Sequence, residues 1–228
     1  MKSEEKVLPS CVGFIMDGNR RFASEQGIGE LEGHQAGKEK FLEVIEWVAE
    51  KEIPHAVFYA FSTENWKREK EEVEHLMFLF RELLVQFKKE ASERKINVRI
   101  VGRQEDLPKD IQNSIKELEA KTTNHKTTIW VAISYGGRAE IVSAINKAIA
   151  LGEEIDEEKF SQLLWTAGMA DPDIIVRTSG EQRLSNFLPW QSVYSELFFT
   201  DTYWPAFTKP EFERILSEYA TRERRVGR

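Results

Sequence analysis

The stretch Val12-Gly-Phe-Ile-Met-Asp17-Gly18-Asn19-Arg20-Arg21-Phe22-Ala23 ends an apolar run abruptly in a carboxylate, a glycine, an amide and two arginines. Residues 11–16 are continuously apolar, which is typical of a strand covered on both faces. Gly18 relaxes the backbone so that amides can turn toward a ligand, and a following helix would add partial positive charge. We therefore predict a buried strand that delivers a loop for a cation and an anion bound together. The alternative is a turn in which Asp17 caps a helix and the arginines are solvated.

At 228 residues and 41% hydrophobic content, the chain is long enough to bury a sizeable core, and no stretch has the composition of a linker. We therefore expect one domain over residues 1–228. No apolar run approaches the roughly 20 residues that cross a bilayer, and no secretory segment follows the start, so we expect a soluble, cytoplasmic protein. The single cysteine, Cys11, argues against a disulfide framework and a cysteine-based metal site.

The net charge of −7 argues against general nucleic-acid binding, which needs a broadly basic face. Lysines lie among glutamates on predicted helix faces, whereas arginines recur at loop positions. Because a guanidinium binds phosphate oxygens with two parallel hydrogen bonds, this distribution indicates a local anionic ligand on an otherwise acidic protein. These arginines are Arg20, Arg21, Arg177, Arg183, Arg222, Arg224, Arg225 and Arg228.

Apolar patterning alternates along the chain between that of a buried strand and that of an amphipathic helix. This order predicts an α/β fold with a central, mainly parallel β-sheet covered by helices. The predicted strands are 11–16, 55–61, 97–102, 128–134, 173–176 and 195–199, and the predicted helices lie around 41–49, 73–87, 108–121, 141–149, 156–164 and from 208 toward the basic tail.

Unusual polar sets follow the predicted strands at the points where the strands end. Ligands of parallel sheets bind beyond the carboxyl ends of the strands, so these sets are expected to meet at one edge. Their convergence predicts a phosphate-binding catalytic cleft. The sets are 17–21, 62–68, Arg103, 136–138 and 177–185.

Two glycine-containing stretches resemble nucleotide-binding loops and are rejected. The stretch Gly33-His-Gln-Ala-Gly-Lys38-Glu39 is one residue short of a P-loop and has glutamate where a hydroxyl should bind magnesium. The stretch from Gly27 to Gly33 misses the dinucleotide fingerprint by one residue. His34 could donate to a phosphate, although a lone histidine at a helix start is more often structural.

Five motifs occur in a fixed order and together carry a family resemblance. They are Asp17-Gly-Asn-x-Arg, Gly33-His34-x-Ala-Gly37, Tyr59-Ala-Phe-Ser-Thr-Glu-Asn-Trp66, Tyr135-Gly-Gly-Arg138 and Arg177-Thr-x-Gly-Glu-x-Arg-Leu-Ser-Asn-Phe187. With them the chain closely resembles the cis-prenyltransferases, the family of undecaprenyl and dehydrodolichyl diphosphate synthases, over about residues 11–227.

The resemblance implies a hydrophobic tunnel beside the sheet and a homodimer or heterodimer. It also implies Mg²⁺-dependent addition of isopentenyl diphosphate to an allylic diphosphate of farnesyl or geranylgeranyl type, giving a Z-polyprenyl diphosphate. Two alternatives remain open: an atypical prenyl-joining enzyme of the same fold, with a different nucleophile or head-to-middle linkage, and a non-catalytic partner subunit. Product length, the allylic primer and any membrane contact for product release also stay open.

Carried over to matching positions, the resemblance makes Asp17 the catalytic aspartate that holds magnesium against the allylic diphosphate. Glu196 corresponds to a metal-associated carboxylate. Asn65 corresponds to the residue assigned to proton removal, although an amide is a weak base and the diphosphate could accept the proton. The implied substrate-binding residues are Gly18, Asn19, Arg20, Arg21, Phe22, His34 and Arg68 for the allylic diphosphate, Ser62, Thr63, Glu64 and Trp66 between the substrates, and Arg177, Arg183, Leu184 and Ser185 for isopentenyl diphosphate.

The chain departs from the family pattern at several positions. Arg20 replaces a frequent glycine, and Glu30 stands where members often carry a phosphate-binding arginine, so Arg20 could compensate for the lost contact. Ser134 and Ser179 replace an asparagine and a glycine. Trp130 would shorten the product if it faced the tunnel, and strand alternation leaves its direction open. The tail from Arg225 to Gly227 either reaches a neighbouring subunit or is a frayed terminus.

Overall fold

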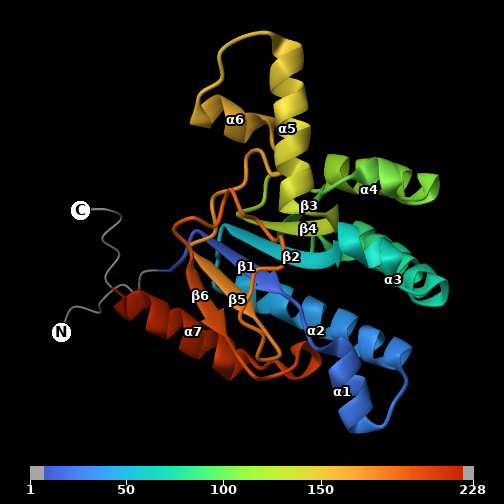
Figure 1. The fold of residues 1–228 in the computed structure, drawn as a ribbon. Helices are drawn as coiled ribbons and strands as arrows, with labels where there is room; N and C mark the ends of the chain where they lie inside the picture. Colours follow the sequence, from blue (N-terminus) through green and yellow to red (C-terminus); the bar gives the residue numbers. More distant parts are fainter. Residues whose placement is uncertain (1–7, 223–228) are drawn as a thin grey trace.

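A six-stranded, entirely parallel sheet forms the centre of the computed structural model, which describes residues 8–222 (Figure 1). The strand order is β3-β4-β2-β1-β5-β6, so the first strand lies inside the sheet, as its apolar sequence predicts. The predicted α/β fold is therefore confirmed. The strands are β1 (Cys11–Ile15), β2 (His55–Ser62), β3 (Ile96–Val101), β4 (Thr127–Tyr135), β5 (Ile174–Arg177) and β6 (Glu196–Phe199).

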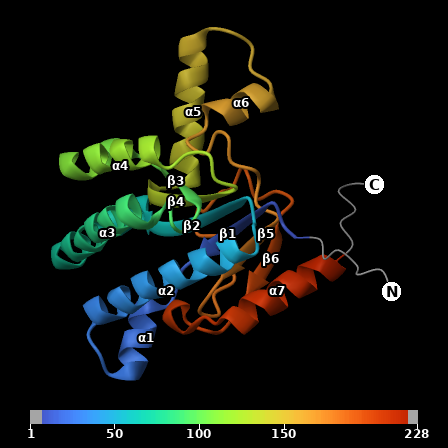
Figure 2. The ribbon, with the colours of Figure 1, turned by 180° about the vertical axis from the view of Figure 1, so that it is seen from behind.

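Four helices cover one face of the sheet, and α2 and α7 cross it side by side in both ribbon views (Figure 2). Aromatic rings fill much of this core, and those of Phe14 on β1 and Phe58 on β2 stack at 4.8 Å between centroids. The covering helices are α2 (Glu30–Glu50), α3 (Lys70–Glu90), α4 (Lys109–Lys121) and α7 (Lys209–Thr221).

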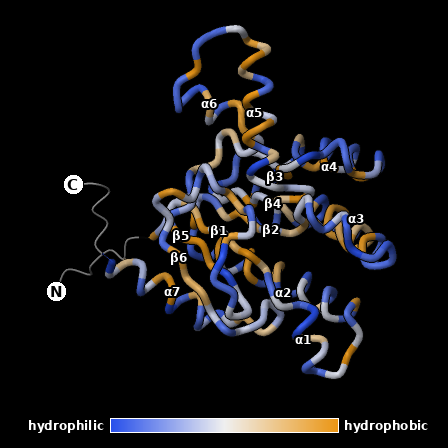
Figure 3. Tube along the Cα trace, viewed as in Figure 1, coloured by the Kyte–Doolittle hydropathy of each residue, from blue (hydrophilic) through white to orange (hydrophobic). Residues whose placement is uncertain are grey.

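The second face is covered by loop residues within 165–170 and 184–188. Helix α5 (Gly137–Leu151) follows β4. It projects from the sheet and carries α6 (Glu157–Leu163) beside its far end (Figure 1). The apolar colour of Figure 3 gathers on the strands, yet α5 also carries apolar segments. Val142, Ile145 and Ile149 recur at helical spacing there and are exposed.

Helix α2 begins at Glu30, well before the predicted 41–49 segment. The prediction was too short because two glycines interrupt the apolar pattern of the first turns. A Cβ added at Gly33 would lie 2.5 Å from the backbone oxygen of Asn19, and one added at Gly37 would lie 2.4 Å from the Asn19 side chain. These glycines let α1 (Asn19–Gln26) lie directly against α2. They serve helix packing and not a phosphate loop.

No helix within residues 8–222 combines the length and apolarity that crossing a membrane requires. Three short 3₁₀ helices come after strands: Thr63–Lys67 after β2, Gln104–Asp106 after β3, and Trp204–Ala206 after β6.

Candidate active site

The carboxyl ends of β1, β2 and β5 border a cavity of about 960 Å³ that reaches between the sheet and the helices α2 and α3. Because all the strands are parallel, their polar ends meet at one edge, as the sequence predicts. The predicted site residues that line this cavity are Asp17, Gly18, Asn19, Arg20, Arg21, His34, Ser62, Glu64, Asn65, Arg68, Arg177 and Ser185.

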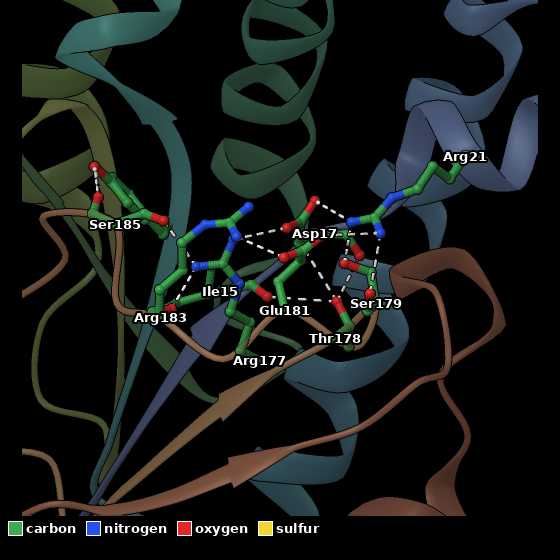
Figure 4. A network of polar contacts seen from close by, with 10 residues as sticks. Ile15, Asp17, Arg21, Arg177, Thr178, Ser179, Glu181, Arg183 and Ser185 are labelled. Atoms are coloured by element: carbon green, nitrogen blue, oxygen red, sulfur yellow. Dashed lines mark hydrogen bonds and ion pairs between the residues drawn. The ribbon is translucent and has the colours of Figure 1, made fainter.

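Asp17 lies at the centre of the polar end of the cavity, between two guanidinium groups (Figure 4). Arg177 donates to its Oδ2 at 2.8 Å, and the Arg21 guanidinium lies 3.5 Å from its Oδ1. Burial opposes ionisation, but the hydrogen bond and the positive charges outweigh it and hold the pKa of Asp17 below its usual value. Asp17 does not cap α1, whose first turn follows Gly18 without a side-chain cap, so the capping alternative is wrong.

The turn after Asp17 accommodates only glycine, at position 18. Its φ is +109°, and an added Cβ would lie 2.8 Å from a ring atom of Tyr203. The glycine therefore sets the direction in which Asp17 and the first turn of α1 face the cavity.

Arg177 is only 4% exposed and joins the two loops that were assigned to different substrates. Besides Asp17, it donates to the hydroxyl of Ser185 at 2.8 Å and to the carbonyl of Arg183. The β1 and β5 loops are also tied through Thr178, whose hydroxyl donates to the Asp17 carbonyl at 2.6 Å. The two proposed diphosphate sites are therefore adjacent.

Ser179 was noted in the sequence only as a departure, and it is a partner of Arg21. The Arg21 guanidinium donates to the Ser179 hydroxyl at 2.6 Å and to its carbonyl at 3.1 Å. Ser179 has φ +78°, a conformation that glycine adopts without strain. The strained serine thus adds a hydroxyl contact that a glycine would lack.

His34 on α2 and Arg68, in the short connection before α3, share the carboxylate of Glu72, which sequence reasoning missed. Arg68 donates to Glu72 Oε1 at 2.8 Å, and His34 Nε2 lies 3.2 Å from the same oxygen. Burial lowers the pKa of His34 despite the opposing effect of Glu72. A signal was present, because Glu72 lies only four residues after Arg68, so the two side chains can pair across the start of α3.

The loop after β2 is held by its own side chains. The Asn65 Oδ1 accepts from the backbone N–H of Ser62 at 2.9 Å and closes the 3₁₀ helix. The Glu64 carboxylate accepts from Asn186 at 3.2 Å. Burial opposes ionisation of Glu64, but hydrogen bonds from its own backbone N–H and from the side chains of Ser62, Asn186 and Thr63 prevail, and its pKa lies below the usual value.

Several predicted site residues do not line the cavity: Phe22, Thr63, Trp66, Arg183, Leu184 and Glu196. Trp66 donates to the Ser134 hydroxyl at 2.8 Å. Arg103, predicted at the same edge, also lies outside the cavity wall. The tail residues Arg224 to Gly227 lie outside the described residues.

Glu196 lies away from Asp17 within one chain. It pairs in register with Ile174, three positions before Arg177, which corresponds to about 10 Å along the strand. Its carboxylate accepts from Arg222 at 2.6 Å. The structure of one chain therefore does not bring the two predicted metal-associated carboxylates together.

Beyond its polar end, the cavity is apolar. Val131 and Ile133 on β4 contribute to its wall, whereas Trp130 packs on the opposite face, where its Nε1 donates to His55 Nδ1 at 3.0 Å. Trp130 therefore does not face the predicted tunnel. The other apolar wall residues include Phe41, Leu76, Met77, Leu79, Phe80 and Leu83.

The donor set at Asp17 fits Mg²⁺, which favours one or two carboxylates together with water and substrate phosphates. The lowered pKa keeps Asp17 ionised at neutral pH. Within residues 8–222, no three His, Cys, Asp or Glu side chains gather as a metal site, so Asp17 would hold a metal here together with oxygens of water or substrate.

Comparison with known proteins supports this geometry. The family model described as putative undecaprenyl diphosphate synthase matches residues 15–227. A tritrans,polycis-undecaprenyl-diphosphate synthase (geranylgeranyl-diphosphate specific) from Thermoplasma volcanium is 47% identical, over 96% of this chain and 89% of that protein. An isoprenyl transferase from Thermotoga maritima is 44% identical, over 96% of this chain and 97% of that protein.

A solved structure of lavandulyl diphosphate synthase from Lavandula x intermedia, in complex with dimethylallyl diphosphate, superposes with a TM-score of 0.94. Its sequence is 32% identical, with 98% of this chain and 100% of that chain covered. The sequence matches extend over nearly the whole chain and agree with a fold whose polar strand ends meet beside an apolar cavity. The chain belongs to the undecaprenyl diphosphate synthase family, and it is a prenyltransferase.

Proposed function

We propose that this protein catalyses Mg²⁺-dependent cis-prenyl chain elongation. It condenses isopentenyl diphosphate with an allylic diphosphate of geranylgeranyl or farnesyl type and forms a Z-polyprenyl diphosphate. The observation that carries this proposal is the contact of Arg177 with both Asp17 and Ser185, at the polar end of an apolar cavity. Two anion-binding loops are thereby held side by side where a hydrocarbon chain can extend away from them.

The allylic diphosphate is assigned to the loop after β1 and the facing helix residues. Arg20, Arg21 and Arg68 bind its oxygens and stabilise the negative charge that grows on the leaving group. Gly18 and Asn19 supply the turn, and His34 adds a donor. Asp17 would hold Mg²⁺ against this diphosphate, and the metal supplies further charge stabilisation when bound.

Isopentenyl diphosphate is assigned to the loop after β5. Arg177 and Ser185 line the cavity, and Arg183 binds from the rim. The Asn65 oxygen already accepts a hydrogen bond, and an amide is a weak base, so we assign proton removal to a diphosphate oxygen. Asn65 then shapes the loop between the substrates together with Ser62 and Glu64.

The apolar wall has two roles in this proposal. It excludes water from the allylic cation that forms when the diphosphate departs, and it accommodates the growing chain. Val131 and Ile133 form part of this wall on the sheet.

We propose that the protein is a homodimer through the exposed apolar side chains of α5 and residues 193–197. Val193 is 70% exposed and Tyr194 is 67% exposed, and such patches commonly mark protein interfaces. Glu196 lies within this segment. A role for it at a metal site would therefore be toward the cavity of a second copy.

Neither alternative from the sequence has gained a supporting observation. A non-catalytic subunit has no need of the Asp17 carboxylate held in the cavity, and no contact of this chain favours a different nucleophile.

The test is incubation of the purified chain with Mg²⁺, labelled isopentenyl diphosphate and either geranylgeranyl or farnesyl diphosphate. We expect longer prenyl diphosphates by chromatography and mass spectrometry, with cis double bonds by NMR. A reaction with added EDTA is the control. The absence of chain growth with every allylic partner would contradict the proposal.

A further inference from the structure

Each of the five lysine and arginine side chains that line the cavity within residues 8–222 has a carboxylate partner. A diphosphate entering this cavity must therefore displace or share a carboxylate at every cation it contacts. The pairs are Arg20–Glu30, Arg21–Asp17, Lys38–Glu82, Arg68–Glu72 and Arg177–Asp17.

The pair of Arg20 and Glu30 differs from the others in position. Two guanidinium nitrogens of Arg20 contact the two carboxylate oxygens of Glu30, each at 3.0 Å. Both residues line the cavity, and their side chains are 55% and 52% exposed. By contrast, Glu72 is 8% exposed, and Arg21 is also bound by Ser179. Arg20 is thus the cavity arginine that an incoming anion reaches most directly.

The Glu30 carboxylate and a diphosphate compete for the same face of Arg20. A carboxylate and a phosphate both bind a guanidinium through two parallel hydrogen bonds, so one occupant excludes the other. Glu30 is also in the first turn of α2, where the partial positive charge of the helix end attracts its carboxylate. The charge of Glu30 additionally repels an anion at the cavity mouth.

We propose that Glu30 is a built-in competitor that occupies Arg20 when the cavity is empty and weakens diphosphate binding there. This inference rests on the proposed function, in which the site binds an allylic diphosphate and releases pyrophosphate after each addition. Glu30 then sets a moderate affinity for both and is an affinity-determining residue. It acts through Arg20 and touches no reacting atom.

The first measurement is calorimetric binding of inorganic pyrophosphate, with Mg²⁺ present, to wild type and Glu30→Gln. We expect about three- to tenfold tighter binding by the variant, because it frees Arg20 and removes a like charge. The Michaelis constant for the allylic diphosphate should fall by a similar factor, without a rise in kcat. Inhibition by pyrophosphate should strengthen.

The matched control is Glu39→Gln. Glu39 is an exposed glutamate of the same helix that accepts from Gln35 and does not line the cavity. This variant removes the same charge, and pyrophosphate affinity should stay close to that of wild type. An equal gain in pyrophosphate affinity in both variants would mean that net charge alone causes the effect, and it would overturn the proposal.

The second measurement repeats the Glu30→Gln change in an Arg20→Gln background. If Glu30 acts mainly through Arg20, most of the gain in pyrophosphate affinity is lost there, and only the smaller part that comes from removing a like charge remains. A gain of the same size in both backgrounds, or none in either, overturns the proposal. The ratios of pyrophosphate affinity between variants test the role of Glu30 and do not depend on chain elongation. A wild-type protein that binds pyrophosphate but elongates no allylic diphosphate would contradict the proposed function alone.

Discussion

Asp17 is the residue on which the proposed chemistry depends, and its charge is maintained by Arg21 on α1 and by Arg177 at the end of β5. We predict that Asp17→Asn lowers kcat by about 100-fold or more, because it removes the metal-binding charge while keeping the side-chain shape. Steady-state assays with both substrates measure this loss. The thermal unfolding midpoint should fall, because the buried Arg177 loses its charged partner, but the chain should still fold, since the backbone contacts with Thr178 remain.

Asp110→Asn is the control for losing an arginine-bound carboxylate, because Asp110 binds Arg81 on the surface away from the cavity. It should retain full activity. Turnover of Asp17→Asn at the wild-type rate would refute the role of Asp17.

Neighbouring residues of β4 permit a paired test of the tunnel wall. Val131 lines the cavity, whereas Trp130 packs on the other face of the sheet. We predict that Val131→Phe shortens the product by at least one prenyl unit, at a stability cost of about 1–3 kcal/mol from overpacking. Trp130→Phe should leave product length unchanged. Mass spectrometry of the products measures chain length. A changed length in Trp130→Phe, with none in Val131→Phe, would show that the chain grows along the other face of the sheet.

At the scale of elements, the close approach of α1 and α2 positions the Asp17 loop. Gly33 touches the first residue of α1, and a Cβ there would meet backbone, which cannot yield as a flexible side chain can. We predict that Gly33→Ala destabilises the protein by about 1–3 kcal/mol, measured by chemical denaturation. It should also raise the Michaelis constant for the allylic diphosphate, because the displaced α1 carries Arg20 and Arg21.

Gly29→Ala is the matched control, because Gly29 has an ordinary φ of −70° and an added Cβ would lie 3.4 Å from a side-chain oxygen of Glu32. Its effect should stay below about 1 kcal/mol. Equal losses in the two variants would show that the spacing of α1 and α2 is not the cause.

At the scale of the whole molecule, one buried and one half-buried histidine make stability depend on pH. Burial lowers the pKa of both His34 and His55 from the usual 6.5, and His55 Nδ1 must be unprotonated to accept from Trp130. The unfolded chain therefore binds more protons below pH 6.5, and stability present above that pH is lost as the pH falls through this range.

We predict that the free energy of unfolding, measured by urea titration, decreases from pH 7.5 to about pH 5.5. His55→Gln should make this decrease in the free energy of unfolding smaller. The control is His125→Gln, at another half-buried histidine, which should leave the decrease unchanged. A slope unchanged by His55→Gln would mean that His55 does not contribute.

The exposed face of α5 predicts the oligomeric state. Ile149 is 73% exposed, and Ile149→Glu should convert the proposed dimer into a folded monomer, as measured by light scattering and circular dichroism. Phe78→Glu is the control, because Phe78 is a 52% exposed apolar residue on a different helix. A wild-type chain that is already monomeric would contradict the proposed interface.

The sequence by itself determined the parallel α/β fold, because alternating apolar patterns leave few other ways to bury both faces of the strands. It also determined the chemical types at the strand ends, which for parallel strands must meet at one edge. The sequence did not predict the full length of α2, because Gly33 and Gly37 weaken its apolar pattern. These glycines are needed for close packing against α1, a contact that the pattern does not reveal.

Only the tertiary structure decided which groups pair: Arg177 with Asp17, Glu72 with His34, and Glu30 with Arg20. It also decided the side of the sheet that Trp130 occupies. The physical reason is that a hydrogen bond or ion pair depends on distances of a few ångströms between atoms. Asp17 and Arg177 lie 160 positions apart in the chain, and only folding brings them within that reach.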